Sequence, residues 1–270
     1  MTILIVLLGL LISHLVFPLA RLRNFDWLLA PIRFVRRRLE QPDWAVAATV
    51  LAVALLVALL LSLGATGLLG QAGWFLAALA VFVYTLGPRD LDRDVQALRI
   101  GGNDTRYLKA RRAMRIRADA GAAAVAAAVF HAALTRWFGI LFWFVVLGIP
   151  GALLYRLTRI SLNEPALTPA QAGWVLRLRE VLDWPVLTLM LLSAALGGDY
   201  DRVRSAWQTH RAGQSAWLLS ADVLDAVAAG VIDEAQPFEQ GLALGHQMVW
   251  RMLLIWLVVL SLLLIVGWLS

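Results

Sequence analysis

Three short acidic segments hold the side chains best suited to chemistry. RDLDRD covers residues 89–94, GGDYDR covers 197–202, and LDWP covers 182–185. Paired carboxylates beside arginines can hold Mg²⁺ together with a substrate phosphate. Acidic side chains are also typical of the first turn of a helix, where they face unpaired backbone N–H groups. We therefore expect helix starts at the first two segments and a helix cap at Asp183, with ligand binding as the alternative.

Two ionisable side chains lie inside an apolar segment. His131 and Arg136 both belong to the stretch 121–137, and ionisable groups within a membrane often mark a pathway or a binding site. We predict that both are membrane-embedded polar groups. His14 also lies in an apolar segment, where a neutral histidine bonded to a neighbouring helix is expected. The four histidines lack ligand spacing and the chain contains no cysteine, so no metal site is expected.

The composition indicates that a membrane positions these groups. The chain has 270 residues, of which 61% are hydrophobic and 16% charged, and its mean hydropathy is +0.75. A soluble domain has about 45–50% apolar residues and about a quarter charged residues. These values exclude a soluble globular protein, a disordered chain and a secreted disulfide scaffold. They predict an all-α, polytopic helical membrane protein with amphipathic helices on its cytoplasmic side.

Apolar segments suited to crossing a bilayer, at about 20 residues each, occur along the whole chain. The candidate spans in this single domain, 1–270, are 2–20, 44–63, 74–86, 121–137, 138–155 and 248–269. We expect 121–137 and 138–155 to form a hairpin with Arg136 near its outer turn. Residues 181–198 are apolar for only about a dozen residues after Pro185, so a re-entrant or interfacial helix is expected there. A helix start is expected at Thr168–Pro169.

The basic residues predict how the chain is oriented. Of 24 basic residues, six lie in 21–38 and nine lie in 89–117. Because Lys and Arg are retained on the cytoplasmic side, both segments are expected there, with the N-terminus on the opposite, periplasmic side. The first apolar segment has no basic n-region and no A-x-A site, so it is expected to be an uncleaved span. No nucleic-acid motif accompanies the net charge of +6, and the expected partner of the basic segments is the bilayer.

Four blocks of the sequence, in order along the chain, resemble the CobD/CbiB superfamily. They are GNDTRYLKARRA, ILFWFVVLGIPGALLYRLTR, REVLDWPVLTL and GGDYDRVRSAWQTHRAGQSAW. Within this superfamily the chain is most similar to the AmpE-like regulatory membrane proteins. The enzymatic branch consists of ATP-dependent adenosylcobinamide-phosphate synthases, which carry an acidic run before the L-F block. At the corresponding positions this chain has Ala127, His131, Ala132 and Thr135.

The resemblance implies a function and a set of partners. ATP-driven amide formation uses carboxylates to bind Mg²⁺ and to stabilise the transferring phosphoryl group, and this chain lacks that set. The resemblance therefore implies a non-catalytic inner-membrane regulator or sensor linked to β-lactamase induction and cell-wall recycling. A membrane-bound ATP-dependent ligase is the alternative, and a carrier or channel ranks third.

The partner implied by the resemblance is a cytoplasmic AmpD-like amidase, with a small anionic ligand as the other candidate. The family resemblance alone suggests nucleotide or Mg²⁺ as a cofactor. The sequence leaves open whether the chain forms a homo-oligomer. The charge pattern supplies candidate ligand-binding residues, because arginines can bind an anionic group in bidentate fashion. These candidates are Arg89, Asp90, Asp104, Arg156, Asp183, Asp199 and Arg202.

Overall fold

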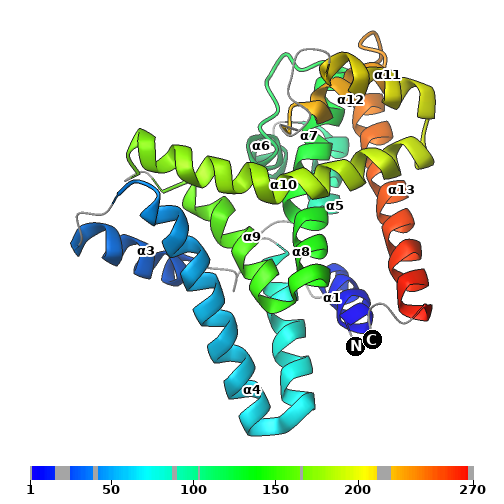
Figure 1. The fold of residues 1–270 in the computed structure, drawn as a ribbon. Helices are drawn as coiled ribbons and strands as arrows, with labels where there is room; N and C mark the ends of the chain where they lie inside the picture. The colour runs from blue at the N-terminus through cyan, green and yellow to red at the C-terminus, as the bar shows by residue number, and fades with distance from the viewer. Residues whose placement is uncertain are drawn as a thin grey trace. The chain divides into compact units, whose positions relative to one another are not determined.

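The chain folds as an all-α protein with membrane-spanning helices. The computed structural model describes residues 2–15, 25–38, 42–86, 90–102, 104–164, 167–211 and 220–266, and these residues form helices and connecting turns without a strand. Within the described part of the chain, four helices are long and apolar enough to cross a membrane: Ala45–Thr85, Ala122–Leu147, Pro169–Gly197 and Phe238–Leu263. The predicted polytopic helical membrane protein is therefore confirmed (Figure 1).

The helices form two compact units. Unit 1 comprises Met1–Pro88, Gly139–Leu182 and Gly267–Ser270, and unit 2 comprises Arg89–Phe138 and Asp183–Val266. Unit 1 contains α1 (Thr2–Leu15), α3 (Asp26–Arg38), α4 (Ala45–Thr85), α8 (Gly139–Leu147) and α9 (Ile149–Ser161). Unit 2 contains α5 (Leu91–Ile100), α6 (Thr105–Ala113), α7 (Ala122–Ala133), η1 (Leu134–Phe138), α11 (Tyr200–Arg211), α12 (Val223–Val231) and α13 (Phe238–Ile265). The boundary between the units falls within α10 (Pro169–Gly197).

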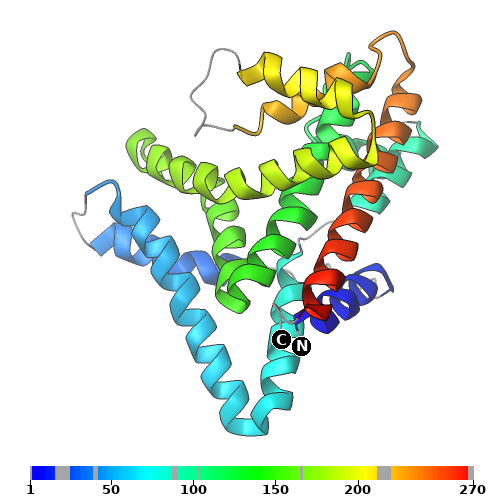
Figure 2. The same ribbon diagram turned by 45° about the vertical axis from the view of Figure 1, so that its right-hand side comes forward.

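In unit 1, α4 is a helical hairpin rather than one straight helix. The chain reverses at Gly70, whose φ of 61° and ψ of −139° are not helical, and both views show the two arms diverging from this turn (Figures 1 and 2). Only glycine adopts this backbone region without steric cost. The two predicted spans, 44–63 and 74–86, are the arms of this hairpin, and both helices extend beyond the predicted bounds as far as Gly70. The hairpin packs against α1, α3 and α9.

The reversal that we expected near Arg136 lies at Gly148 instead. One continuous helix covers Ala122–Leu147 and includes Arg136 within the π-helical segment η1. Gly148 has a φ of 67° and a ψ of −142°, and α9 then packs back against α8. The expectation was wrong for two reasons: Arg136 has a buried acidic partner and needs no aqueous turn, and Gly148 can adopt a positive φ.

The apolar stretch 181–198 is the second half of α10 and not a separate short helix. The helix start at Thr168–Pro169 is confirmed: Thr168 Oγ1 accepts from the Gln171 N–H at 3.2 Å, and Gln171 Oε1 accepts from the Thr168 N–H at 3.3 Å. This reciprocal pair is a capping box. Because α10 begins at Pro169 and has 29 residues, Asp183 lies mid-helix and is not a cap. That prediction is wrong, and Pro185 is tolerated inside the helix.

In unit 2, small residues bring α7 and α13 close together. Gly241 and Gly245 on α13 face Ala122 and Ala126 on α7, and a Cβ added at Gly245 would lie 2.9 Å from the Ala126 Cα. Small residues spaced four apart allow such close approach of membrane helices. The alanine-rich start of α7 therefore packs closely against α13. α7 also packs against α12, and α12 packs against α11.

Candidate functional site

A buried ion pair joins α5 to η1 in unit 2. Arg136 Nη1 lies 2.8 Å from Asp94 Oδ2, and the two side chains are 10% and 5% exposed. Asp94 lies on the buried face of α5 with Leu91, Val95 and Leu98. Arg136 is presented by a single π-helical segment, a feature that is frequent at functional sites. Both charged groups are shielded from solvent. Burial of either one without the other would carry a large desolvation cost.

A second polar group joins α5 to α13. Asp92 Oδ1 lies 2.6 Å from His246 Nε2 and accepts from Trp250 Nε1 at 3.1 Å. His246 and Trp250 are one turn apart on α13, which places both on the same face. The Trp250 ring also meets the Trp137 ring edge to face, with centroids 5.5 Å apart. We call Asp92, Asp94, Arg136, His246 and Trp250 the inner polar cluster.

The other sequence-predicted membrane-embedded group, His131, has a different setting. His131 Nε2 lies 3.1 Å from Asp225 Oδ2, which links α7 to α12. The two side chains are partly exposed, whereas the Asp94–Arg136 pair is buried. Both His131 and Arg136 lie in the apolar helix Ala122–Leu147, and each is paired with an acidic residue of unit 2.

Two predicted binding residues cap helices. Asp90 precedes α5 and accepts from the Asp92 N–H at 3.0 Å, and its other oxygen lies 3.9 Å from Arg93 Nε. Asp199 precedes α11 and accepts from the Arg202 N–H at 3.2 Å, while its second oxygen lies 3.3 Å from Arg202 Nε. The helix starts predicted at RDLDRD and GGDYDR are therefore confirmed. Asp199 and Arg202 contact each other at an exposed surface.

The remaining predicted binding residues have varied settings. Asp104 is exposed at the start of α6, and Asp183 is buried within α10. Arg156 is buried on α9, where its guanidinium carbon lies 4.7 Å from the centroid of the Phe25 ring. Arg89 lies outside the described residues. Arg156 belongs to unit 1, and the other described members of the predicted set belong to unit 2.

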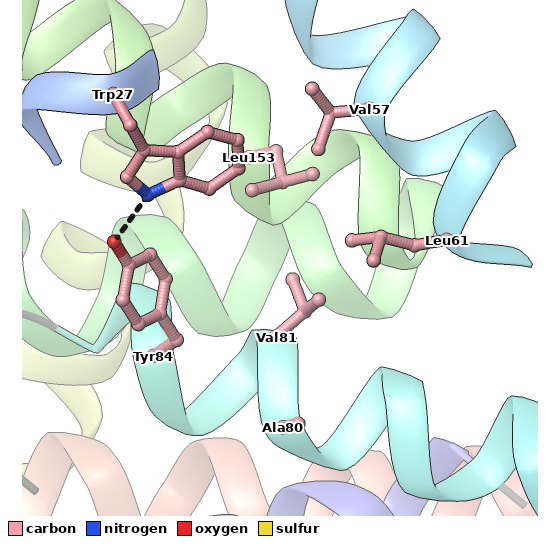
Figure 3. Close-up of a pocket in the computed structure, with 7 residues that line it drawn as sticks. All are labelled: Trp27, Val57, Leu61, Ala80, Val81, Tyr84 and Leu153. Atoms are coloured by element: carbon pink, nitrogen blue, oxygen red, sulfur yellow. Dashed lines mark hydrogen bonds between the residues drawn. The ribbon is translucent and has the colours of Figure 1, made fainter. Parts of the chain in front are cut away.

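Unit 1 contains an open groove of ≈ 470 Å³ between α3, α4 and α9 (Figure 3). Its walls are formed by the apolar side chains of Val57, Leu61, Ala80, Val81 and Leu153. Its polar atoms come from Trp27 and Tyr84, and the Trp27 Nε1–H donates to the Tyr84 hydroxyl at 3.1 Å. A site of this size and character suits an apolar ligand.

Sequence reasoning did not identify four members of the inner polar cluster: it assigned Asp92 and Asp94 to a helix start, and it did not single out His246 and Trp250. One signal was available for Asp94, which is three residues after Leu91 and four before Leu98. That spacing places a carboxylate on the apolar face of an amphipathic helix, where a charged partner is required. No local signal connects His246 with Asp92, which lies 154 residues earlier.

Comparison of the chain with family models, curated proteins and solved structures gives no match. The AmpE-like resemblance therefore stays a prediction, and the function has to be argued from the chain's own residues. Among the described residues, no group of three or more His, Asp or Glu side chains is placed to hold a metal ion.

Proposed function

We propose that this multi-pass membrane protein is an AmpE-like regulator or sensor of the bacterial inner membrane that acts by binding. The observation that carries the proposal concerns α7 and η1, at the positions where the synthases carry their acidic run. Ala127 and Ala132 are buried there, and the Thr135 hydroxyl donates to the Ala132 carbonyl at 3.0 Å. A helix surface made of packed alanines supplies no carboxylate for Mg²⁺ or a phosphoryl group, which supports binding over ATP-dependent ligation.

The use of the acidic side chains in unit 2 also supports this proposal. Asp94 is paired with Arg136, Asp92 with His246, and Asp225 with His131. These contacts connect α5, η1, α7, α12 and α13, so the carboxylates organise the helices of the unit. In a protein that acts by binding, such polar contacts give the helices a defined arrangement that a ligand can alter.

An exposed basic surface on α6 and the turn after it would be the contact site. It consists of Arg106, Lys109, Arg112, Arg115 and Arg117. Clustered cations raise the local concentration of an anionic partner and speed its association. We propose that this basic surface faces the cytoplasm, as the positive-inside rule predicts, with the N-terminus on the periplasmic side. Its partner would be a small anionic ligand or an acidic patch on an AmpD-like amidase.

Complementation in a host with inducible β-lactamase tests this function. A strain lacking its AmpE-like gene would receive the wild type, an Arg106→Glu/Lys109→Glu/Arg112→Glu variant, or a matched Arg177→Glu/Arg204→Glu control. Arg177 and Arg204 are also exposed and lie outside the basic surface. We expect the wild type and the control to restore induction and the triple variant to behave like the deletion strain, at equal amounts of membrane protein.

The ligase alternative predicts a different result. The same wild-type gene would be expressed in a strain that lacks cobinamide-phosphate synthase. We expect no growth unless cobinamide phosphate is supplied. Growth without it would overturn the regulatory proposal, and so would full restoration of induction by the triple variant.

A further inference from the structure

The groove of unit 1 has a buried floor and an accessible rim. Val81 and Leu153 are buried at its base, whereas Leu61, Ala80 and Trp27 are exposed at its edge. Both arms of the α4 hairpin contribute to it, and this hairpin is among the helices long and apolar enough to cross a membrane. A groove that opens on such a surface is reached from the hydrocarbon of the bilayer.

The lining of the groove is polar at one end and apolar at the other. Tyr84 lies near the end of the second arm of α4 and bonds to Trp27 on α3, so the polar atoms are at the open end of the hairpin. Along the first arm, Val57 and then Leu61 approach the reversal at Gly70. Along the second arm, Ala80 lies one turn, about 6 Å, nearer to that reversal than Tyr84. The lining therefore changes from polar to apolar toward the turn, as Figure 3 shows.

Positive charge accompanies the polar end of the groove. Trp27 and Arg33 both lie on α3. Arg33 on this helix remains 38% exposed while it contacts Glu164 at 2.8 Å. The guanidinium of Arg156 lies against Phe25, whose ring meets the Tyr84 ring with centroids 4.6 Å apart. Tryptophan, tyrosine and arginine are the side chains that membrane proteins place at the headgroup level.

We propose that this groove binds one acyl chain of an anionic phospholipid from the surrounding bilayer. The chain would lie between the arms of α4 and against α9, with its end toward Gly70 and the phosphate beside α3. The apolar walls exclude a small water-soluble anion as the occupant, and the Arg156 guanidinium, which lies against Phe25 beside Tyr84, favours an anionic over a zwitterionic headgroup. This site is in unit 1 and does not depend on the proposed function, which rests on unit 2.

Native mass spectrometry of the delipidated full chain in detergent tests the proposal. Phosphatidylglycerol and phosphatidylcholine with identical acyl chains would be titrated onto the wild type, Ala80→Phe and Ala52→Phe. Ala80 lines the groove and is exposed at its rim, so phenylalanine fills the space without entering the core. Ala52 is equally exposed on α4 outside the groove, and it is the matched control for the same substitution.

We expect one phosphatidylglycerol to be retained by the wild type and the Ala52→Phe control, and Ala80→Phe to bind it at least about tenfold more weakly, roughly the effect of losing one well-buried apolar contact. Phosphatidylglycerol should bind more tightly than phosphatidylcholine, by about fivefold for one arginine near the phosphate. An Arg156→Gln variant should reduce that preference.

Three results would overturn the proposal. Equal retention by Ala80→Phe and the wild type would show that lipid binds outside the groove. Equal binding of the two lipids would refute the anionic headgroup. Displacement of phosphatidylglycerol by free glycerol phosphate at similar concentration would show that the acyl chain does not hold the ligand.

Discussion

Substitution of Asp94 by asparagine should destabilise unit 2 strongly. The substitution removes a carboxylate 2.8 Å from Arg136, in a pair whose side chains are only 5% and 10% exposed. At an effective dielectric constant of 20, two unit charges at this separation attract each other by about 6 kcal/mol. The desolvation of both ions offsets part of that attraction, and removal of one partner of a buried pair costs about 3–5 kcal/mol. We expect a loss in that range because the Arg136 charge stays buried without its carboxylate.

The assay is a double-mutant cycle measured by reversible unfolding in mixed micelles. Asp94→Asn, Arg136→Met and the double variant would be compared with the wild type. Replacing both ions should cost less than either single substitution, because no uncompensated charge then remains. Asp199→Asn is a matched control: it weakens an Asp–Arg pair of 3.3 Å whose side chains are 51% and 62% exposed, and its cost should be below about 1 kcal/mol. Additive effects of Asp94→Asn and Arg136→Met would refute the reasoning.

Three further predictions concern single positions. Gly245→Leu should separate α7 from α13, because even a Cβ at this position would lie 2.9 Å from the Ala126 Cα. We expect a lower unfolding midpoint and a loss of at least about 1–3 kcal/mol in the free energy of unfolding. An unchanged midpoint would contradict the packing. Trp250→Phe should lower the free energy of unfolding by about 1–3 kcal/mol in the same assay, because Asp92 loses a hydrogen-bond donor. A decrease no larger than that caused by Trp44→Phe, an exposed control, would count against the hydrogen bond. Gly148→Ala should cost about 1–3 kcal/mol because its φ of 67° is strained for alanine, whereas Gly173→Ala, inside α10, should stabilise the helix by about 1 kcal/mol.

Features that depend on local sequence could be predicted. The hydropathy of successive segments specified the all-α membrane class, because a bilayer imposes helix length directly. The capping pair of Thr168 and Gln171 and the helix starts at Asp90 and Asp199 follow from residues within one turn. For the same reason 44–63 and 74–86 could be predicted as separate spans, although the position of the reversal between them is set by the backbone of Gly70.

Features that depend on partners distant in the chain could not be predicted from the sequence. An arginine inside an apolar segment suggested a turn exposed to water, and the helix continues because Asp94, 42 residues earlier, neutralises it. Asp183 carried the local pattern of a cap, yet α10 extends through it to Gly197. His246 and Asp92 contact each other across 154 residues, a relation that no spacing in one sequence contains. The candidate site could be anticipated only at Arg136 and His131.

The position of α5 suggests how binding at the basic surface would affect unit 2. This helix has ten residues and carries both carboxylates of the inner polar cluster, Asp92 toward α13 and Asp94 toward η1. It also packs against α6, which bears most of the basic surface. A partner that displaces α6 therefore acts on the one short helix that holds both polar contacts. Because a buried ion pair tolerates little displacement before its desolvation cost dominates, such a movement would favour one of two discrete arrangements over a gradual adjustment.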